Sequence, residues 1–102
     1  MANMHKIGST ATTVRTENGY TIVRYHNTDV VKFNSDEIVL NTGGWKTNTT
    51  KARMNQTSNV YGLGYRVYQI KGTWYVDCLD EENGIGYGKT ISFNGDRLTI
   101  RR

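Results

Sequence analysis

The sequence predicts an α+β domain dominated by antiparallel β-hairpins, arranged as a meander with one helix in the middle of the chain. Short runs rich in Val, Ile, Thr, Tyr and Phe alternate with turn signals such as Asn-Gly and Lys-Gly. One stretch, at about residues 48–61, breaks this pattern and contains helix formers. A length of 102 residues, of which 36% are hydrophobic, leaves room for one modest core. We expect a flexible tail over residues 1–9 and a single β-rich domain over residues 10–102.

The predicted strands follow one another as hairpins. Asn18-Gly19 suits a tight type I′ turn between the first two strands, and Lys71-Gly72 joins a later pair. Asn94-Gly95-Asp96 is expected to join the last two strands into a hairpin of their own. The expected strands are Thr12–Thr16, Tyr20–His26, Asp29–Phe33, Glu37–Asn41, Tyr65–Ile70, Thr73–Cys78, Lys89–Phe93 and Arg97–Arg102.

The one predicted helix has recognisable ends. Thr47, Asn48 or Thr49 can cap its N-terminus, and Gly62 and Gly64 are expected to end it. Its sequence, NTTKARMNQTSNVY, is so polar that the apolar face is narrow. We therefore expect this helix to have more than a structural role.

The composition argues against a membrane or secreted protein. No apolar stretch approaches the ~20 residues of a membrane span, and the first nine residues lack the apolar region of a secretory signal. The single cysteine, Cys78, cannot form an internal disulfide, which favours a reducing cytoplasm. A disulfide between two copies of the chain through Cys78 is the alternative.

The charge is unevenly distributed. The chain carries a formal charge of +4, and Ile38–Val76 contains five cations and no Asp or Glu. We expect Lys46, Lys51, Arg53 and Arg66 to converge on one electropositive surface. An anionic partner follows from this arrangement.

The segment from residue 41 to residue 53 is the best candidate for a binding site. Its glycines permit close backbone approach, its threonines supply hydroxyls, and free N–H groups at a helix N-terminus favour an anion. The glycines are adjacent, so the segment is not a P-loop. Trp45 is the candidate for stacking on a base. A structural Gly-Gly turn, with Trp45 in the core, is the alternative. The candidate ligand-binding residues are Thr42, Gly43, Gly44, Trp45, Lys46, Thr47, Thr49, Thr50, Lys51, Arg53 and Arg66.

Catalytic and metal-binding patterns are weak. The two histidines are His5, in the tail, and His26, at a strand end, where a structural role is the simpler interpretation. Nothing in the sequence pairs His26 with Cys78 as a base and a nucleophile. The acidic stretch from residue 77 to residue 84 lacks the alternating ligands of a calcium loop. We expect no enzymatic activity, no metal and no cofactor.

Several literal strings resemble a known group of proteins. They are RYHNTDVV at 24–31, NTGGWKT at 41–47, TTKARMNQ at 49–56, YGLGY at 61–65 and WYVD at 74–77. Together they are similar to a family of small tailed-bacteriophage proteins that carries no assigned activity. The resemblance implies a phage gene product that acts in the cytoplasm of an infected bacterium.

Two classes of function are consistent with these features. The first is a homo-oligomeric counter-defence factor that sequesters a nucleotide-like immune signal in a basic, aromatic-lined pocket. The second is an accessory protein that binds nucleic acid or a host protein. A minor component of the virion is a further alternative.

Overall fold

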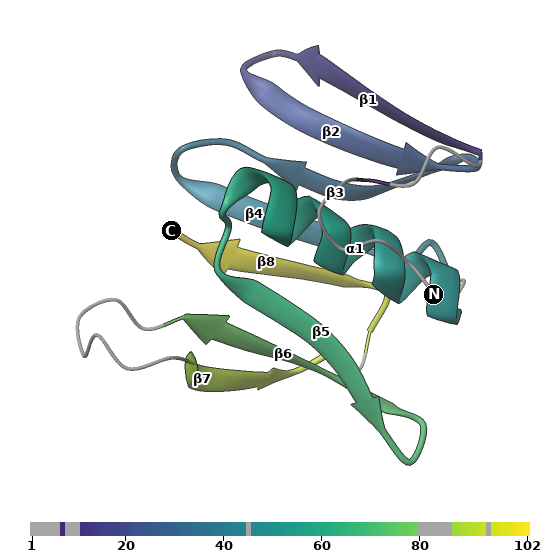
Figure 1. The fold of residues 1–102 in the computed structure, drawn as a ribbon, viewed down its shortest axis with the longest axis vertical. Coiled ribbons are helices and arrows are strands. Elements are labelled where there is room, and N and C mark those ends of the chain that lie inside the picture. The colour runs from purple at the N-terminus through teal and green to yellow at the C-terminus, as the bar shows by residue number, and fades with distance from the viewer. Residues whose placement is uncertain (1–6, 8–10, 45, 80–86, 94) are drawn as a thin grey trace.

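The described residues form two antiparallel sheets and one helix (Figure 1). The computed structural model describes residues 7, 11–44, 46–79, 87–93 and 95–102. The five-stranded sheet has the order β1-β2-β3-β4-β8, and the three-stranded sheet has the order β5-β6-β7. The elements are β1 (Thr12–Glu17), β2 (Tyr20–Tyr25), β3 (Thr28–Phe33), β4 (Glu37–Asn41), α1 (Asn48–Tyr61), β5 (Tyr65–Ile70), β6 (Thr73–Leu79), β7 (Tyr87–Ser92) and β8 (Arg97–Arg101).

The predicted α+β class is confirmed, and so is the single mid-chain helix among the described residues. The helix occupies residues 48–61 as expected, and each strand begins and ends within two residues of its predicted bounds. The turn between β1 and β2 has positive φ angles of 53° at Asn18 and 83° at Gly19. Lys71 and Gly72, between β5 and β6, show the same pattern with 50° and 82°. Both turns thus have the left-handed backbone of a type I′ hairpin.

The predicted hairpin between the last two strands is wrong. β7 pairs with β6, whereas β8 crosses to the other sheet and pairs with β4, where Ile100 lies opposite Ile38. The segment between β7 and β8 is bonded to both sheets. The Phe93 N–H donates to the carbonyl of Trp74 in β6, and the Asp96 carbonyl accepts from the N–H of Thr42, which follows β4. The apolar side chains of β8 therefore complete the core of the larger sheet.

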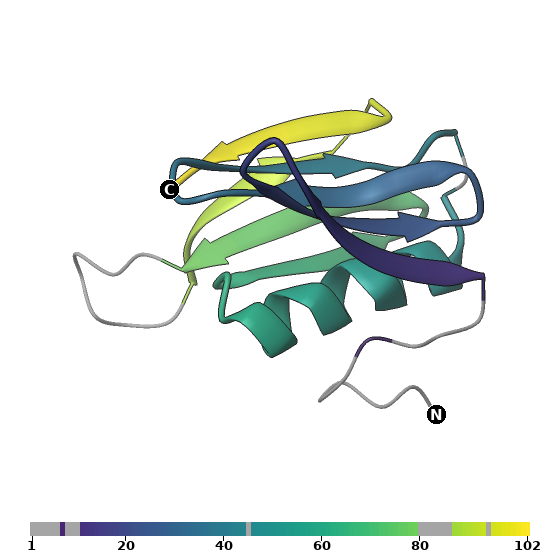
Figure 2. The same cartoon turned by 90° about the horizontal axis from the view of Figure 1, so that it is seen from above.

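The core lies between the two sheets and the helix. Figure 2, a view at 90° to the first, shows α1 running along one side of the strands. Trp74 meets Phe93 edge to face at 6.1 Å between ring centroids, and Met54 is the buried methionine of the helix. The buried cluster consists of Val23, Val30, Val31, Phe33, Ile38, Leu40, Met54, Tyr65, Val67, Trp74, Val76, Phe93 and Ile100.

The polar side of α1 binds the free edge of β5. Ser58 Oγ donates to the Tyr65 carbonyl at 2.8 Å and accepts from the Tyr65 N–H at 3.1 Å. Three residues earlier, Asn55 Nδ2 donates to the Val67 carbonyl at 2.9 Å, and its Oδ1 accepts from the Val67 N–H at 2.7 Å. Two helical side chains thus occupy the position of a neighbouring strand.

The helix therefore has a structural role that its sequence does not suggest. An apolar stripe is the usual reason for a helix to pack on a sheet. Here hydrogen bonds, rather than an apolar stripe, hold the helix against the sheet. Thr50, Gln56, Thr57 and Ser58 are buried although they are polar. The polarity of the helix is thus no sign of a functional surface. Among the described residues, no helix is long and apolar enough to cross a membrane.

Asn55→Ala is expected to destabilise the fold by about 1–3 kcal/mol, because it leaves the N–H and C=O of Val67 without partners. Asn59→Ala is the matched control, since Asn59 is exposed on the same helix and the change in helix propensity is the same. Urea unfolding of both variants measures the difference. Equal unfolding midpoints for the two variants would show that the contact with β5 contributes nothing.

Candidate functional site

A cavity of about 410 Å³ opens between the N-terminus of α1 and the turn that joins β2 to β3. This volume lies within the range of about 300–1,000 Å³ that is typical of small-molecule sites. One side of the cavity comes from the end of β2, the turn and β3, and the other comes from the end of β4 and the first turn of α1. The described residues that line it are Tyr25, His26, Asn27, Thr28, Val30, Thr42, Thr47 and Thr50.

The turn between β2 and β3 supplies the aromatic and polar rim of the cavity. His26 has a φ of 55°, a left-handed conformation that few residues other than glycine adopt. Its N–H donates to the Ala11 carbonyl at 2.7 Å, which ties the turn to the residue before β1. The imidazole lies 4.4 Å from the Tyr25 ring, measured between centroids. The two rings therefore form one wall next to an exposed polar turn.

The first turn of α1 supplies hydrogen-bond donors. Thr47 caps the helix by accepting from the Thr50 N–H at 3.2 Å, and its carbonyl accepts from the Lys51 N–H. These two bonds leave the N–H groups of Asn48 and Thr49 without an intrahelical acceptor. No acidic residue lies in this turn. The positive end of the helix dipole thus faces the same region as the cavity.

The Gly43-Gly44 turn is held by hydrogen bonds within the chain and packs against Thr28. The Gly43 N–H donates to Asn41 Oδ1 at 2.9 Å, and the Gly44 N–H donates to Thr42 Oγ1 at 3.2 Å. A Cβ at Gly43 would overlap the Thr28 side chain, so only glycine permits this approach. Both backbone amides therefore already have acceptors, while the part of Gly43 and Gly44 in ligand binding stays a prediction.

Arg53 places a buried positive charge behind the Tyr25 wall. Its side chain is buried, and the guanidinium lies 5.6 Å from the centroid of the Tyr25 ring. Nε donates to Thr12 Oγ1 at 2.9 Å, and Nη1 donates to Gln56 Oε1 at 3.3 Å. No carboxylate of the described residues forms an ion pair with it. A buried cation with neutral partners is costly, and a nearby anion would offset that cost.

The expected convergence of four cations on one surface is wrong. Lys51 and Arg53 are two positions apart, or about 200° around the helix axis, and they contact different sheets. Lys51 Nζ donates to Gln69 Oε1 at 2.6 Å and lies over the Trp74 ring. Lys46 is exposed before the helix. Arg66 is the neighbour of Tyr65, whose backbone bonds to Ser58 near the end of α1. Arg66 therefore lies at the end of the helix opposite the cavity.

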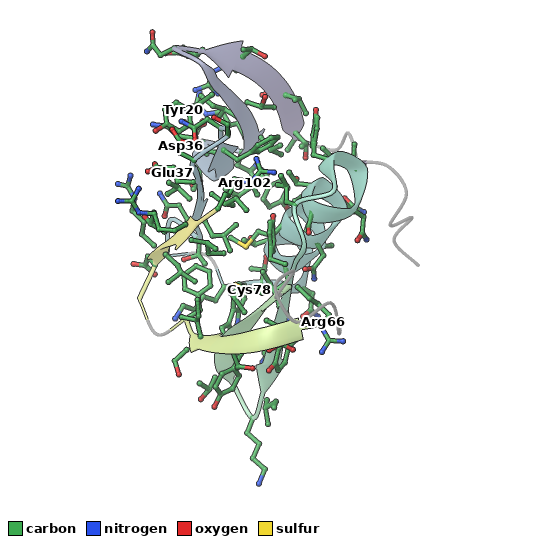
Figure 3. All side chains as sticks on the ribbon, turned by 90° about the vertical axis from the view of Figure 1, so that its left-hand side faces the viewer. Tyr20, Asp36, Glu37, Arg66, Cys78 and Arg102 are labelled. Carbon is green, nitrogen blue, oxygen red and sulfur yellow. The ribbon has the colours of Figure 1, made fainter. Side chains whose placement is uncertain are left out.

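Arg66, labelled in Figure 3, belongs to a separate cluster on the outer face of the smaller sheet, opposite the face that buries Tyr65 and Val67. Its guanidinium bonds to Asp77 at 3.2 Å and lies 5.1 Å from the centroid of the Tyr68 ring. Burial raises the pKa of the Asp77 carboxyl, but hydrogen bonds from Thr90, Tyr68 and Arg66 outweigh this effect and hold it below its ordinary value. Tyr68 stacks on Tyr75 with 5.7 Å between ring centroids. This acid neutralises a cation that the sequence suggested was unopposed.

Some of the predicted site residues lie at the cavity and others do not. Thr42, Thr47 and Thr50 line the cavity, Gly43 packs beside it, and Thr49 lies in the first helical turn. Gly44 and Lys46 are exposed nearby. Trp45 and the acidic residues 80–82 lie outside the described residues. Within the described part of the chain, no group of three His, Cys, Asp or Glu side chains is arranged to hold a metal.

Sequence reasoning missed the half of the cavity that comes from β2, β3 and their turn. These residues are Tyr25, His26, Asn27, Thr28 and Val30. The available signal was the break in the strand pattern at residues 26–28, where a turn contains neither Gly nor Pro. In this turn, His26 takes the left-handed conformation, which histidine adopts more readily than most residues other than glycine.

Comparison with known protein families gives a match over most of the chain. The model of a family described as Kyanoviridae Gp96 protein matches residues 1–99. No curated protein and no solved structure matches the chain. The expected origin in a bacteriophage is confirmed at the level of the family, while the literal strings that suggested it are not themselves tested by the match.

Gly43→Ala is expected to destabilise the protein more than Gly44→Ala. Both residues have positive φ, which costs an L-residue roughly 1–2 kcal/mol, but only Gly43 faces a neighbouring side chain. The overlap with Thr28 should add roughly 1–3 kcal/mol. Thermal unfolding measures both variants.

The double variant Gly43→Ala with Thr28→Ala is the control for this contact, with Thr28→Ala alone as its reference. It should recover part of the additional loss, because the atoms that overlap are removed. If the two glycine variants melt together, or if the second substitution restores nothing, the Gly43–Thr28 contact does not shape the cavity.

Proposed function

We propose that this chain, which belongs to the Kyanoviridae Gp96 family of bacteriophage proteins, binds a small anionic, nucleotide-like ligand in the cavity at the N-terminus of α1. The observation that carries the proposal is the coincidence of three features. They are a cavity of suitable volume, a helix end with free N–H groups, and the buried Arg53 charge behind the cavity wall.

Each part of the cavity suits a different part of such a ligand. The helix N-terminus can donate to a phosphate or carboxylate, and so can one hydroxyl of the Thr47–Thr50 pair, whose Oγ1 atoms bond to each other at 3.1 Å. The rings of Tyr25 and His26 offer faces and edges against which a base can pack. Arg53 raises the electrostatic potential of the cavity without occupying it. A ligand with both a planar ring and a negative charge uses all three.

Binding alone would be sufficient for the biological role that we propose. In an infected bacterium, a phage protein that captures a nucleotide-like immune signal lowers the free concentration of that signal and so blocks the defence. This role requires affinity and no chemical step. The protein is therefore proposed to act in the host cytoplasm as a non-enzymatic counter-defence factor that needs no metal or cofactor.

A second candidate function rests on the outer face of the smaller sheet. Tyr68 and Tyr75 form a stacked pair there, and the Arg66 guanidinium lies over the Tyr68 ring. Aromatic rings combined with arginine on a sheet are suited to unpaired bases of single-stranded nucleic acid. In this alternative the cavity is not the functional site, and affinity falls steeply with salt as counterions are released.

The Arg53→Met variant tests the proposed site. Titration of the purified protein with a panel of mono-, di- and cyclic nucleotides should identify a binder, and Arg53→Met should weaken that binder at least tenfold, or by about 1.4 kcal/mol. Arg66→Met is the matched control, because it removes the same cation at the opposite end of α1. It should bind the nucleotide as the wild type does.

Native mass spectrometry of protein purified from infected cells provides an independent measurement. A retained adduct with the mass of a nucleotide supports the proposal. The proposal is overturned if no adduct is retained and no nucleotide of the panel binds. Loss of affinity in Arg66→Met but not in Arg53→Met would instead assign function to the outer face of the smaller sheet.

A further inference from the structure

Strand β8 lies at one end of the five-stranded sheet, and its pairing with β4 fixes which of its backbone groups point outward. The Thr42 N–H donates to the Asp96 carbonyl at one end of the pair, and the Arg102 N–H donates to the Asp36 carbonyl at the other. Because bonding alternates along an antiparallel ladder, the even-numbered residues of β8 face β4 throughout. The outward N–H and C=O groups are therefore those of Arg97, Thr99 and Arg101.

These three residues, which we call the β8 edge, are exposed. The described residues that flank them, Asp96 and Arg102, are exposed as well. Within the part of the chain that the structure describes, β4 is the one strand that pairs with β8. Figure 2 shows β8, in yellow, on the side of the molecule away from α1. The β8 edge thus presents backbone donors and acceptors in the pattern that another strand can satisfy.

The β8 edge also carries two cations on one face of the sheet. Alternate residues of a strand point to the same face, so Arg97 and Arg101 lie on the same side. No carboxylate of the described residues forms an ion pair with either of them. Glu37 lies opposite Arg101 in β4, but its carboxylate accepts from the Tyr20 hydroxyl at 3.1 Å. Acidic groups of a partner can therefore neutralise both arginines.

We propose that the β8 edge binds an extended acidic segment of another protein, which joins the five-stranded sheet as an additional strand. The backbone of this segment bonds to the outward groups of β8, and its carboxylates lie opposite Arg97 and Arg101. The two acidic residues are therefore four positions apart. The residues next to them point to the other face, where apolar side chains can cover the partly buried Leu98.

Two other occupants fit this edge less well. A second copy of this chain would bring the same two arginines to the contact. In every register that joins outward groups to outward groups, arginines of the two copies lie opposite or diagonal to each other, and like charges facing one another are destabilising. The phosphates of a nucleic acid accept hydrogen bonds but donate none, so they leave the outward carbonyls without partners. A strand with acidic side chains satisfies both the backbone and the charge.

Amide hydrogen exchange of the wild-type protein tests the added strand. The probe is a peptide with blocked ends and the sequence Thr-Glu-Val-Thr-Val-Glu-Thr, and the control peptide has Gln in place of both Glu residues. Near saturation, the probe should slow the exchange of the Arg97, Thr99 and Arg101 amides by roughly tenfold or more, because each gains an acceptor. The amides of Leu98 and Ile100, which already bond to β4, should change little. Absence of this protection, or equal binding of the Gln peptide, overturns the proposal.

A charge swap tests the part of the two arginines. Arg97→Glu should weaken binding of the acidic peptide by about fivefold. Lys71→Glu is the matched control, because it changes the net charge equally in the turn between β5 and β6, and it should bind as the wild type does. The double variant Arg97→Glu with Arg101→Glu should prefer a peptide with Lys in place of both Glu residues.

The proposal fails if the double variant keeps its affinity for the acidic peptide and gains none for the lysine peptide. Single-stranded DNA serves as the competing ligand. If DNA shifts the NMR signals of β8 without slowing the exchange of its amides, and the acidic peptide does not bind, the two arginines serve a nucleic acid and the proposal is wrong.

Discussion

The arrangement of the whole chain depends on how the free edge of β5 is satisfied. The backbone groups of Tyr65 and Val67 face away from β6, and Asn55 and Ser58 of α1 supply their partners. Because these contacts run along one side of the helix, they fix the direction of α1 relative to the smaller sheet, and Arg53 contacts Thr12 and Tyr25 of the larger one. The helix N-terminus is thereby directed at the turn between β2 and β3, and the cavity forms where the two meet.

Local features of the sequence were sufficient to predict most elements of the fold. Left-handed turns at Asn18-Gly19 and Lys71-Gly72, and the Thr47 and Gly62 caps, are encoded by residues next to one another. The partner of β8 is not encoded locally. An Asn-Gly-Asp sequence is compatible with a hairpin, and only the apolar residues of β4, which need an opposing strand, direct β8 to the other sheet.

The candidate site was predicted in part for the same reason. Its threonines belong to one continuous segment with a recognisable helix start, so the sequence identified them. Its other half comes from a turn some twenty residues earlier, and no local pattern connects the two. The predicted convergence of the cations was wrong because the sequence gives their number but not the direction in which each side chain leaves the helix. Arg53 and Lys51 consequently face different sheets.

The central claim is that an anion binds where the first turn of α1 faces the turn between β2 and β3. The most direct measurement is an amide NMR titration of the wild-type protein with the nucleotide that binds most tightly. If the anion binds there, we expect shifts concentrated at Asn48 and Thr49 and at residues 25–28, with the downfield movement typical of N–H groups that gain an acceptor. Shifts confined to β5 and β6, or spread evenly over the surface, would contradict it.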